Sequence, residues 1–250
     1  MRILLLDIET RPDLAYVWGA YEQNAIAIKE HWSILSYAFK WYGEGGKAEV
    51  VALPDFKGYR PGKTDDKALV KTLHALLEQA DAIVAHNGMQ FDLRKINARF
   101  IAHGMPPPSP VKVIDTKREA SRVAAFSSNK LDWLCRQLDI GAKIEHEGWA
   151  MWEGCIAGDE KDWAKMRKYN LHDIELLEQL FERLKPWMRL PNQSLHSDKG
   201  CPSCGQTGKM VKWGTAFLRS RAYQRWRCNA CGAYSRDLKN ATAKTDRVGL

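Results

Sequence analysis

The chain has 250 residues, which is enough for one mid-sized domain and a small second module but not for two full enzymes. Hydrophobic residues make up 45% and charged residues 27% of it, so a wholly disordered, collagen-like or coiled-coil protein is excluded. No apolar run reaches the roughly 18 residues of a membrane helix, and the apolar start is too short for a signal peptide. We therefore expect a soluble cytoplasmic protein without a membrane segment.

Apolar periodicity predicts strands and helices over the first 185 residues. Short apolar or alternating runs predict strands at residues 2–7, 32–42, 48–53, 82–85 and 111–114. Apolar residues three and four apart predict helices at residues 65–79, 90–103, 129–138 and 161–184. This order predicts an α/β fold, a sheet flanked by helices, for residues 1–185. Pro, Ser and Gly then predict a linker at 186–200 before a small module at 201–250.

The formal net charge of +8 is concentrated near one end of the chain. Residues 199–250 contain 11 Lys and Arg against two acids, whereas residues 1–198 contain 27 basic and 28 acidic side chains. A basic block of this kind typically binds an anionic partner, most often nucleic acid, although a solubilising surface has the same composition.

Two carboxylates stand at the end of the first predicted strand. Because alternate residues of a strand share a face, Asp7 and Glu9 lie side by side. Two hard oxygen ligands suit Mg²⁺ or Mn²⁺, and a cation would relieve their repulsion. A solvated strand end can carry the same two residues, so this pair alone does not define a site.

Further acids occur at later places in the chain. Asp92 stands in the first turn of a predicted helix, where it can also simply complement the helix dipole. Tyr169 and Asp173 are four apart on one face of the long helix, a spacing that also suits a buried hydrogen bond. Asp115 follows another strand, and we expect it to cap a helix at 116–122 rather than to act in catalysis.

These segments resemble the three motifs of the DnaQ-like DEDD family of 3′–5′ exonucleases. The motifs are Asp-x-Glu after an apolar strand, an Asn turn followed by Phe-Asp, and Tyr-x-x-x-Asp. The matching residues are Asp7, Glu9, Asn87, Phe91, Asp92, Tyr169 and Asp173. Position 168 is lysine rather than the histidine of the other branch, which indicates the Tyr branch. The resemblance covers about residues 1–185 and implies an RNase H-like fold.

The resemblance also implies a reaction that uses two Mg²⁺ or Mn²⁺ ions to hydrolyse phosphodiester bonds. Asp7 would bridge both ions. Glu9 and Asp173 would complete one site, and Asp92 would support the other. Tyr169 would orient the attacking water.

Four of the six cysteines lie in the tail as two CxxC pairs. Cys201 and Cys204 are separated from Cys228 and Cys231 by 23 residues, a spacing that suits a closed, structural Zn²⁺ site. One Zn²⁺ would stabilise a module too small to fold on its own core. Free or disulfide-bonded pairs are the alternative.

Basic and aromatic side chains interleave between the cysteine pairs, so cations can neutralise phosphates while rings stack on unpaired bases. Residues 224–232 are similar to the zinc ribbons of some transposases, which bind DNA. We expect Arg219, Arg221 and Arg225 to contact substrate; a protein–protein role for the ribbon stays open. By the family resemblance, Asn87 and Phe91 would contact the terminal nucleotide, although for Phe91 we favour a place in the core.

Together these features predict a metal-dependent 3′–5′ exonuclease that acts preferably on single-stranded DNA. The alternatives are a 3′ RNA-trimming exoribonuclease and an inactive RNase H-like scaffold that only binds nucleic acid. Four retained acids argue against the scaffold, because a repulsive cluster serves no purpose there. A replication or repair protein is the expected class of protein partner, and a bacterial or phage-infected cell is the expected host.

Overall fold

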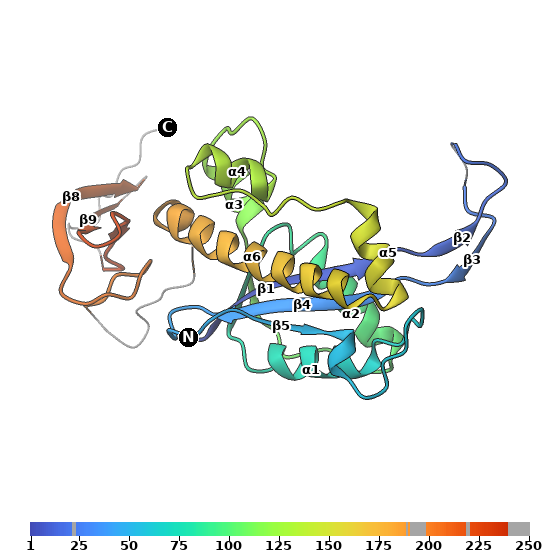
Figure 1. The fold of residues 1–250 in the computed structure, drawn as a ribbon. Helices are drawn as coiled ribbons and strands as arrows, with labels where there is room; N and C mark the ends of the chain where they lie inside the picture. The colour runs from blue at the N-terminus through green and yellow to red at the C-terminus, as the bar shows by residue number, and fades with distance from the viewer. Residues whose placement is uncertain (22–23, 189, 191–198, 219–220, 240–250) are drawn as a thin grey trace. The chain divides into compact units, whose positions relative to one another are not determined.

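The computed structural model describes residues 1–21, 24–188, 190, 199–218 and 221–239 (Figure 1). The chain divides into two compact units, Met1–Phe181 and Glu182–Leu250. Within the described residues, no helix is both long enough and apolar enough to cross a membrane.

The larger unit is built on a five-stranded sheet with the order β5-β4-β1-β6-β7. The strands are β1 Ile3–Arg11, β4 Ser33–Trp41, β5 Glu49–Ala52, β6 Ala82–Ala85 and β7 Lys112–Asp115. β4 pairs antiparallel with β1 and β5, whereas β6 pairs parallel with β1 and β7. This mixed sheet confirms the predicted α/β class.

Helices cover both faces of this sheet. They are α1 Lys67–Leu77, α2 Asp92–Ala102, α3 Thr116–Val123, α4 Leu131–Gln137, α5 Trp149–Ala157 and α6 Glu160–Leu184, with 3-10 turns η1 Leu53–Asp55 and η2 Lys185–Trp187. In Figure 1, α6 runs along one side of the sheet and α1 lies on the other. The inward face predicted for the last helix is confirmed, since Trp163, Met166, Ile174 and Leu177 are buried.

β1 occupies the centre of the sheet because its first half is apolar on both faces. Leu4, Leu5 and Leu6 have no exposed surface. On one face, Leu4 and Leu6 join the hydrophobic core that contains Leu69 of α1. On the other face, Asp7 meets α6 through a hydrogen bond from Asn170. The first half of β1 is therefore buried on both faces, and the strand brings Asp7 against α6.

A buried ion cluster fastens two helices to the sheet. Asp66, just before α1, is fully buried and accepts a hydrogen bond from the backbone N–H of Ile34 in β4 at 2.9 Å. It also pairs with Arg99 of α2 at 2.6 and 2.8 Å and with His103 at 2.6 Å. One carboxylate therefore connects β4, α1 and α2.

The structure differs from the sequence prediction at three places in the larger unit. β1 continues to Arg11, so Asp7 and Glu9 lie within the strand rather than at its end. The helix α5 was not predicted. Strands β2 Leu14–Tyr16 and β3 Ala27–Glu30, also not predicted, form an antiparallel arm that projects from the sheet (Figure 1).

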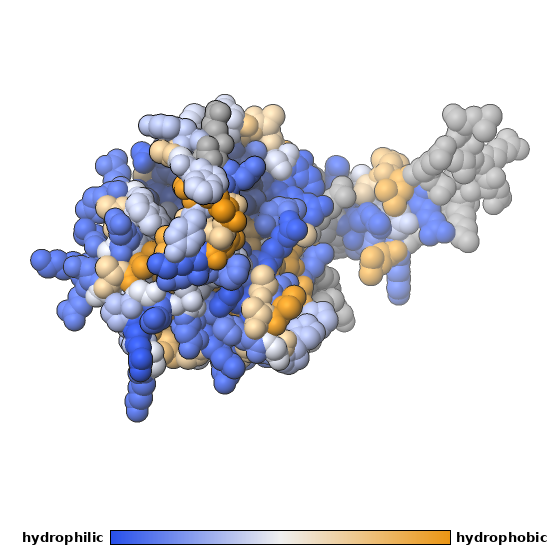
Figure 2. Space-filling model, turned by 90° about the vertical axis from the view of Figure 1, so that its right-hand side faces the viewer, coloured by the Kyte–Doolittle hydropathy of each residue, from blue (hydrophilic) through white to orange (hydrophobic). Residues whose placement is uncertain are grey.

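The arm has no buried face, which explains why periodicity does not reveal it. Its large apolar side chains are all at least 45% exposed: Leu14, Tyr16, Val17, Trp18, Tyr21, Ile26 and Ile28. Figure 2 looks onto the side of the molecule from which the arm projects and shows hydrophobic side chains among hydrophilic ones.

The smaller unit contains a three-stranded antiparallel sheet with the order β10-β9-β8. Its strands are β8 Met210–Leu218, β9 Arg221–Cys228 and β10 Tyr234–Arg236. The buried residues here are few and include Cys201, Tyr223, Cys228 and Ala233. Of the predicted linker, residues 189 and 191–198 lie outside the described residues.

Candidate active site and metal centres

Three of the predicted acids converge where β1 meets α6. Asp7 and Glu9 project from the same face of β1, and Asp173 comes from α6. One carboxylate oxygen from each lies within 4.8 Å of the others. The convergence follows from the alternation of side chains along β1 and from the passage of α6 over that face. The predicted pairing of Asp7 with Glu9 on one face is therefore present.

Asp92 reaches the same region from the first turn of α2. It is buried, and its Oδ1 accepts a hydrogen bond from the backbone N–H of Ile8 at 3.2 Å. Ile8 lies between Asp7 and Glu9, so this bond ties the second motif to the first. Asp92 is not one of the three carboxylates within 4.8 Å of one another, although its charge acts on Asp7.

Burial raises the pKa values of all four carboxyl groups, and repulsion from the other acids of the cluster adds to this effect at Asp7 and Glu9. Burial followed by the charge of Asp173 raises the pKa of Glu9 to about 8, and burial raises that of Asp92 to about 7. The pKa of Asp7 is raised well above its usual range by burial and then by Asp92, Glu9 and Asp173. Burial also raises the pKa of Asp173. Such a cluster is electrostatically costly unless cations neutralise it.

Lys143 brings a positive charge into this cluster, and sequence reasoning missed it. Its Nζ donates hydrogen bonds to the Tyr169 hydroxyl at 2.9 Å and to Oδ2 of Asp173. Burial alone would lower the pKa of the Lys143 ammonium group, but the charge of Asp173 and the hydrogen bonds to Asp173 and Tyr169 together outweigh burial and raise that pKa. The loop that carries Lys143 is held by Asp132, which accepts its backbone N–H at 2.8 Å, and by a 2.8 Å bond between His172 and the Ala142 carbonyl.

Asn170 is a second missed residue, and it orients Asp7. It is fully buried, and its Nδ2 donates to Oδ2 of Asp7 at 2.7 Å. Its Oδ1 in turn accepts a hydrogen bond from the Ser36 hydroxyl of β4 at 3.0 Å. This chain of bonds leaves Asp7 little rotational freedom.

Tyr169 lies against Lys143 and is 8% exposed. Burial and then the charge of Asp173 raise the pKa of its hydroxyl to about 12, so the group stays protonated at neutral pH. It can therefore orient a neighbouring molecule by hydrogen bonding but cannot serve as a general base.

The carboxylate cluster fits divalent metal ions. Oδ1 of Asp173 is buried and, within the described part of the chain, has no hydrogen-bond partner, while Oδ2 is held by Lys143. A buried carboxylate oxygen without a partner is costly, and it faces a set of oxygen atoms from Asp7 and Glu9. Hard oxygen donors in this number suit Mg²⁺ or Mn²⁺.

The four tail cysteines also converge. All four sulfur atoms lie within 4.8 Å of one another, with Sγ···Sγ distances of 3.7 Å for Cys201 and Cys231 and 3.8 Å for Cys204 and Cys228. Tetrahedral Zn²⁺ with Zn–S bonds of about 2.3 Å separates its sulfurs by about 3.8 Å. The cluster therefore has the dimensions of a Cys₄ zinc site, and disulfides are absent from the described cysteines.

The other two cysteines, Cys135 of α4 and Cys155 of α5, have no exposed surface. Burial raises the pKa of the Cys135 thiol to about 11 and that of Cys155 to about 12. Neither belongs to a metal-ligating group among the described residues.

The described residues that were predicted to contact substrate lie in the turn before α2 and on β9. Asn87 adopts a positive φ of 67° in the turn before α2, and Phe91 is 40% exposed at the start of that helix, so Phe91 does not belong to the core. Arg221 and Arg225 are exposed on β9. Arg219 lies outside the described residues.

Asp115 caps α3, as predicted, by accepting the backbone N–H groups of Lys117 and Arg118. It also accepts those of Asn87 and Met89 at 3.0 and 3.1 Å. The same carboxylate therefore holds the turn before α2 as well as the start of α3.

The order and directions of the five strands are those of an RNase H-like fold, and the carboxylates lie on β1 and α6 of that fold. A sequence profile of the RNase_H superfamily matches residues 51–185, more than half of the chain. The chain belongs to the RNase_H superfamily.

Two known proteins show where similar chains occur. Over 115 residues the chain is 29% identical to the DNA polymerase III PolC-type of Ureaplasma parvum serovar 3; the match covers 45% of this chain and 8% of that protein. The family B DNA polymerase from the archaeon Pyrobaculum calidifontis shares the fold, with a TM-score of 0.53 and 17% identity over 74% of this chain and 25% of that one. The chain thus spans a small part of the length of either relative.

Proposed function

We propose that the protein is a metal-dependent 3′–5′ exonuclease of the DEDD Tyr type. The observation that carries this proposal is the convergence of Asp7, Glu9 and Asp173 beside Tyr169, with Asp92 tied to the same strand. Membership of the RNase_H superfamily supports a nuclease in general. The two relatives are DNA polymerases, which supports DNA rather than RNA as the substrate.

In this proposal the four carboxylates hold two Mg²⁺ or Mn²⁺ ions. Bound divalent ions supply a nucleophile at neutral pH and neutralise charge on the attacking and leaving oxygens. Asp7 is the shared ligand, since it lies within reach of Glu9 and Asp173 and is influenced by Asp92. Asn170 keeps the Asp7 carboxylate in its ligating orientation.

Tyr169 positions the attacking water by hydrogen bonding, and Lys143 positions Tyr169. The Lys143 ammonium group also offsets part of the negative charge of Asp173 before any substrate binds. The same ammonium group can attract the negatively charged oxygens of a bound phosphodiester.

The smaller unit serves as a zinc ribbon that binds single-stranded nucleic acid. The Sγ···Sγ distances support one structural Zn²⁺ held by the four cysteines. On β9, Arg221 and Arg225 share a face, because they are four residues apart in a strand. Exposed cations there can neutralise phosphates, and the exposed ring of Phe217, 79% accessible on β8, can stack on a base. A replication or repair protein in a bacterial or phage-infected cytoplasm is the proposed setting.

The direct test incubates the protein with Mg²⁺ or Mn²⁺ and single strands of DNA or RNA labelled at the 5′ end. We expect a descending ladder on DNA that disappears with Asp7→Asn. The control Asp13→Asn, which changes an acid just before β2 and outside the cluster, should retain it. A faster reaction on RNA would instead establish the RNA-trimming alternative. Immediate release of labelled mononucleotide would show the opposite polarity. Intact binding without hydrolysis would favour the inactive scaffold or an enzyme that depends on a partner.

A further inference from the structure

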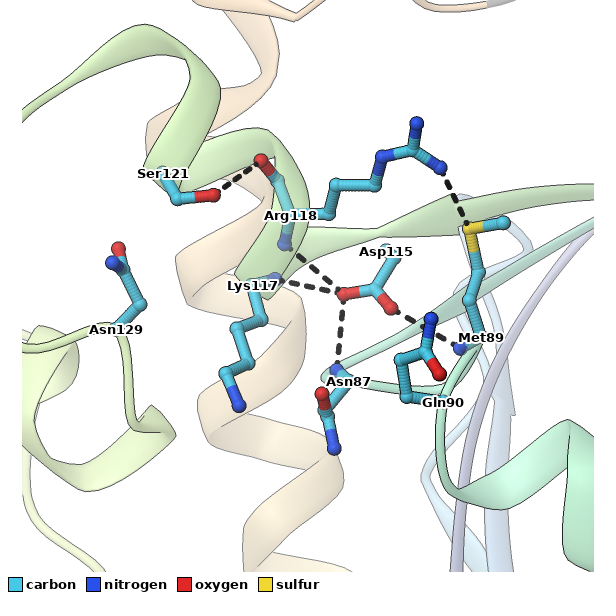
Figure 3. A pocket seen from close by; sticks show the side chains of 8 residues that line it. All are labelled: Asn87, Met89, Gln90, Asp115, Lys117, Arg118, Ser121 and Asn129. Atoms are coloured by element: carbon cyan, nitrogen blue, oxygen red, sulfur yellow. Dashed lines mark hydrogen bonds between the residues drawn. The ribbon is translucent and has the colours of Figure 1, made fainter.

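A polar pocket lies beside the turn that leads into α2, outside the carboxylate cluster. Its volume is about 290 Å³. Figure 3 shows the side chains that line it, which include Asn87, Gln90, Lys117, Arg118, Ser121 and Asn129. They come from three separate segments, namely the turn before α2, the helix α3 and the loop before α4.

Asp115 also lines this pocket and holds two of its walls together. The dashed lines of Figure 3 join its two oxygens to the backbone N–H groups of Asn87, Met89, Lys117 and Arg118, at 3.0 to 3.2 Å. The carboxylate is 5% exposed, so its acceptor capacity is used internally. The backbone of the turn and of the start of α3 is thereby fixed around the opening.

The lining contains two cations, Lys117 and Arg118, against the one carboxylate of Asp115, and it is rich in hydrogen-bonding groups. Neither Lys117 nor Arg118 forms an ion pair with an acidic side chain of the described residues; the Arg118 guanidinium group instead donates to the Met89 sulfur at 3.6 Å. The Oδ1 atom of Asn129 is buried and, in the described part of the chain, lacks a hydrogen-bond partner. A ligand that carries both negative charge and hydrogen-bonding groups would satisfy all of these side chains.

The pocket and the carboxylate cluster share one turn. Gly88, in the same turn as Asn87, lies so close to α2 that an added Cβ would stand 3.8 Å from Oδ2 of Asp92 and 2.4 Å from Cβ of Ala85. Asn87 therefore lines the pocket while the next residue, Gly88, lies beside Asp92. For a nucleic acid strand whose end is bound at Asp92, this pocket is a neighbouring site.

We propose that the pocket binds the phosphate backbone of the substrate strand, upstream of the bond that is cut. Lys117 and Arg118 extend in opposite directions (Figure 3), so they hold different phosphates, and the amides of Asn87, Gln90 and Asn129 contact the nucleoside between them. This assignment rests on the proposed function, because it takes the substrate to be a nucleic acid strand that enters the carboxylate cluster by its end.

The test measures binding separately from hydrolysis. In an Asp7→Asn background, fluorescence anisotropy with a labelled single-stranded DNA of about 12 nucleotides gives the affinity at several salt concentrations. The double variant Lys117→Gln/Arg118→Gln should bind on the order of ten-fold more weakly. It should also reduce the slope of log K against log salt by roughly 0.7 for each phosphate that the protein no longer neutralises.

The matched control is Lys67→Gln/Lys71→Gln, which removes two exposed cations from α1. A second variant, Ser121→Asp, places a negative charge in the pocket without touching the N–H groups that Asp115 holds, and it should also weaken binding most strongly at low salt. Affinity and salt slope equal to those of the control would overturn the pocket assignment. Failure of the proposed function is a different result: the protein with Asp7 intact would then leave DNA and RNA uncut.

Discussion

Lys143 sits among carboxyl groups that would otherwise repel one another. Its ammonium group joins Asp173 to Tyr169, so its removal changes both the charge of the cluster and the orientation of the tyrosine. Loss of Lys143 should lower kcat rather than the free energy of unfolding, because the side chain is partly exposed and lies on a loop.

We expect Lys143→Gln to lower kcat on single-stranded DNA by on the order of 100-fold, the scale of a missing positioning group. The control is Lys165→Gln, a surface lysine paired with Glu147 and Asp162. Steady-state kinetics and urea unfolding of both variants decide the matter. Equal kcat values for the two variants would show that Lys143 has no part in the reaction.

His86 is held in its neutral form. Burial lowers its pKa to about 4, and its ring nitrogens bond to the Thr116 hydroxyl and the Asn129 carbonyl, each at 2.9 Å. In the unfolded chain the imidazole takes up a proton below about pH 6.5. In the folded protein it does so only near pH 4. Acid therefore favours the unfolded state between these two values.

The stability that His86 contributes is present above pH 6.5 and is lost as the pH falls to about 4, an effect of roughly 3 kcal/mol. Urea unfolding at pH 7, 5.5 and 4.5 measures it. In His86→Gln, which keeps a donor for the Asn129 carbonyl, the loss of unfolding free energy over this range should be smaller by about that amount. An identical loss in both proteins would show that His86 titrates normally.

The four acids and Tyr169 were predicted because their residue types and spacing define motifs, whereas two of their partners were not. The burial of Asn170 can be predicted from the sequence. It lies four residues after Met166 and four before Ile174, on the apolar face of a predicted helix. A polar side chain there must have a buried partner. Lys143 left no such signal, since it stands in an aperiodic stretch and lysines are common on surfaces.

At the scale of elements, Asp66 acts as a joint between α1, α2 and β4. Replacing it by alanine leaves the guanidinium group of Arg99 without its bidentate partner and the N–H of Ile34 without an acceptor. Loss of one member of a buried ion pair costs about 3–5 kcal/mol.

Asp66→Ala should therefore lower the unfolding free energy by about 3–5 kcal/mol in urea titrations monitored by circular dichroism. The neighbouring exposed Asp65, which only accepts the Lys67 N–H at 3.0 Å, provides the control Asp65→Ala, with an expected loss of about 1 kcal/mol. Similar losses for the two variants would contradict the role of the ion cluster.

The elements that were predicted are those that carry their own periodic pattern. Strands β1, β4 and β6 are apolar, and α6 presents one buried face, so local sequence suffices. α5 depends on tertiary contact: a Cβ at Gly154 would meet Oδ2 of Asp162 at 1.8 Å, so the helix packs against α6 through a glycine. No local pattern encodes that approach.

At the scale of the whole molecule, the two units rest on different kinds of stabilisation. The larger one buries an extensive hydrophobic core, whereas the smaller one buries few side chains around four cysteines. A unit of this kind usually requires its metal to fold.

We expect about one Zn²⁺ per chain by elemental analysis, and its loss in Cys201→Ser and Cys228→Ser. Cys135→Ser, outside the cluster, should retain it. Zinc-free protein with an intact smaller unit by NMR would contradict the assignment of the four cysteines.

Because Cys135 and Cys155 are protected, the number of alkylated cysteines reports the state of each unit. Only thiolates react with alkylating reagents, and these two thiols have raised pKa values and no exposed surface. With metal bound, native protein should gain no adduct in a mass spectrum. After chelation it should gain four, and only after denaturation six. The number of adducts thus reports which of the two units has opened.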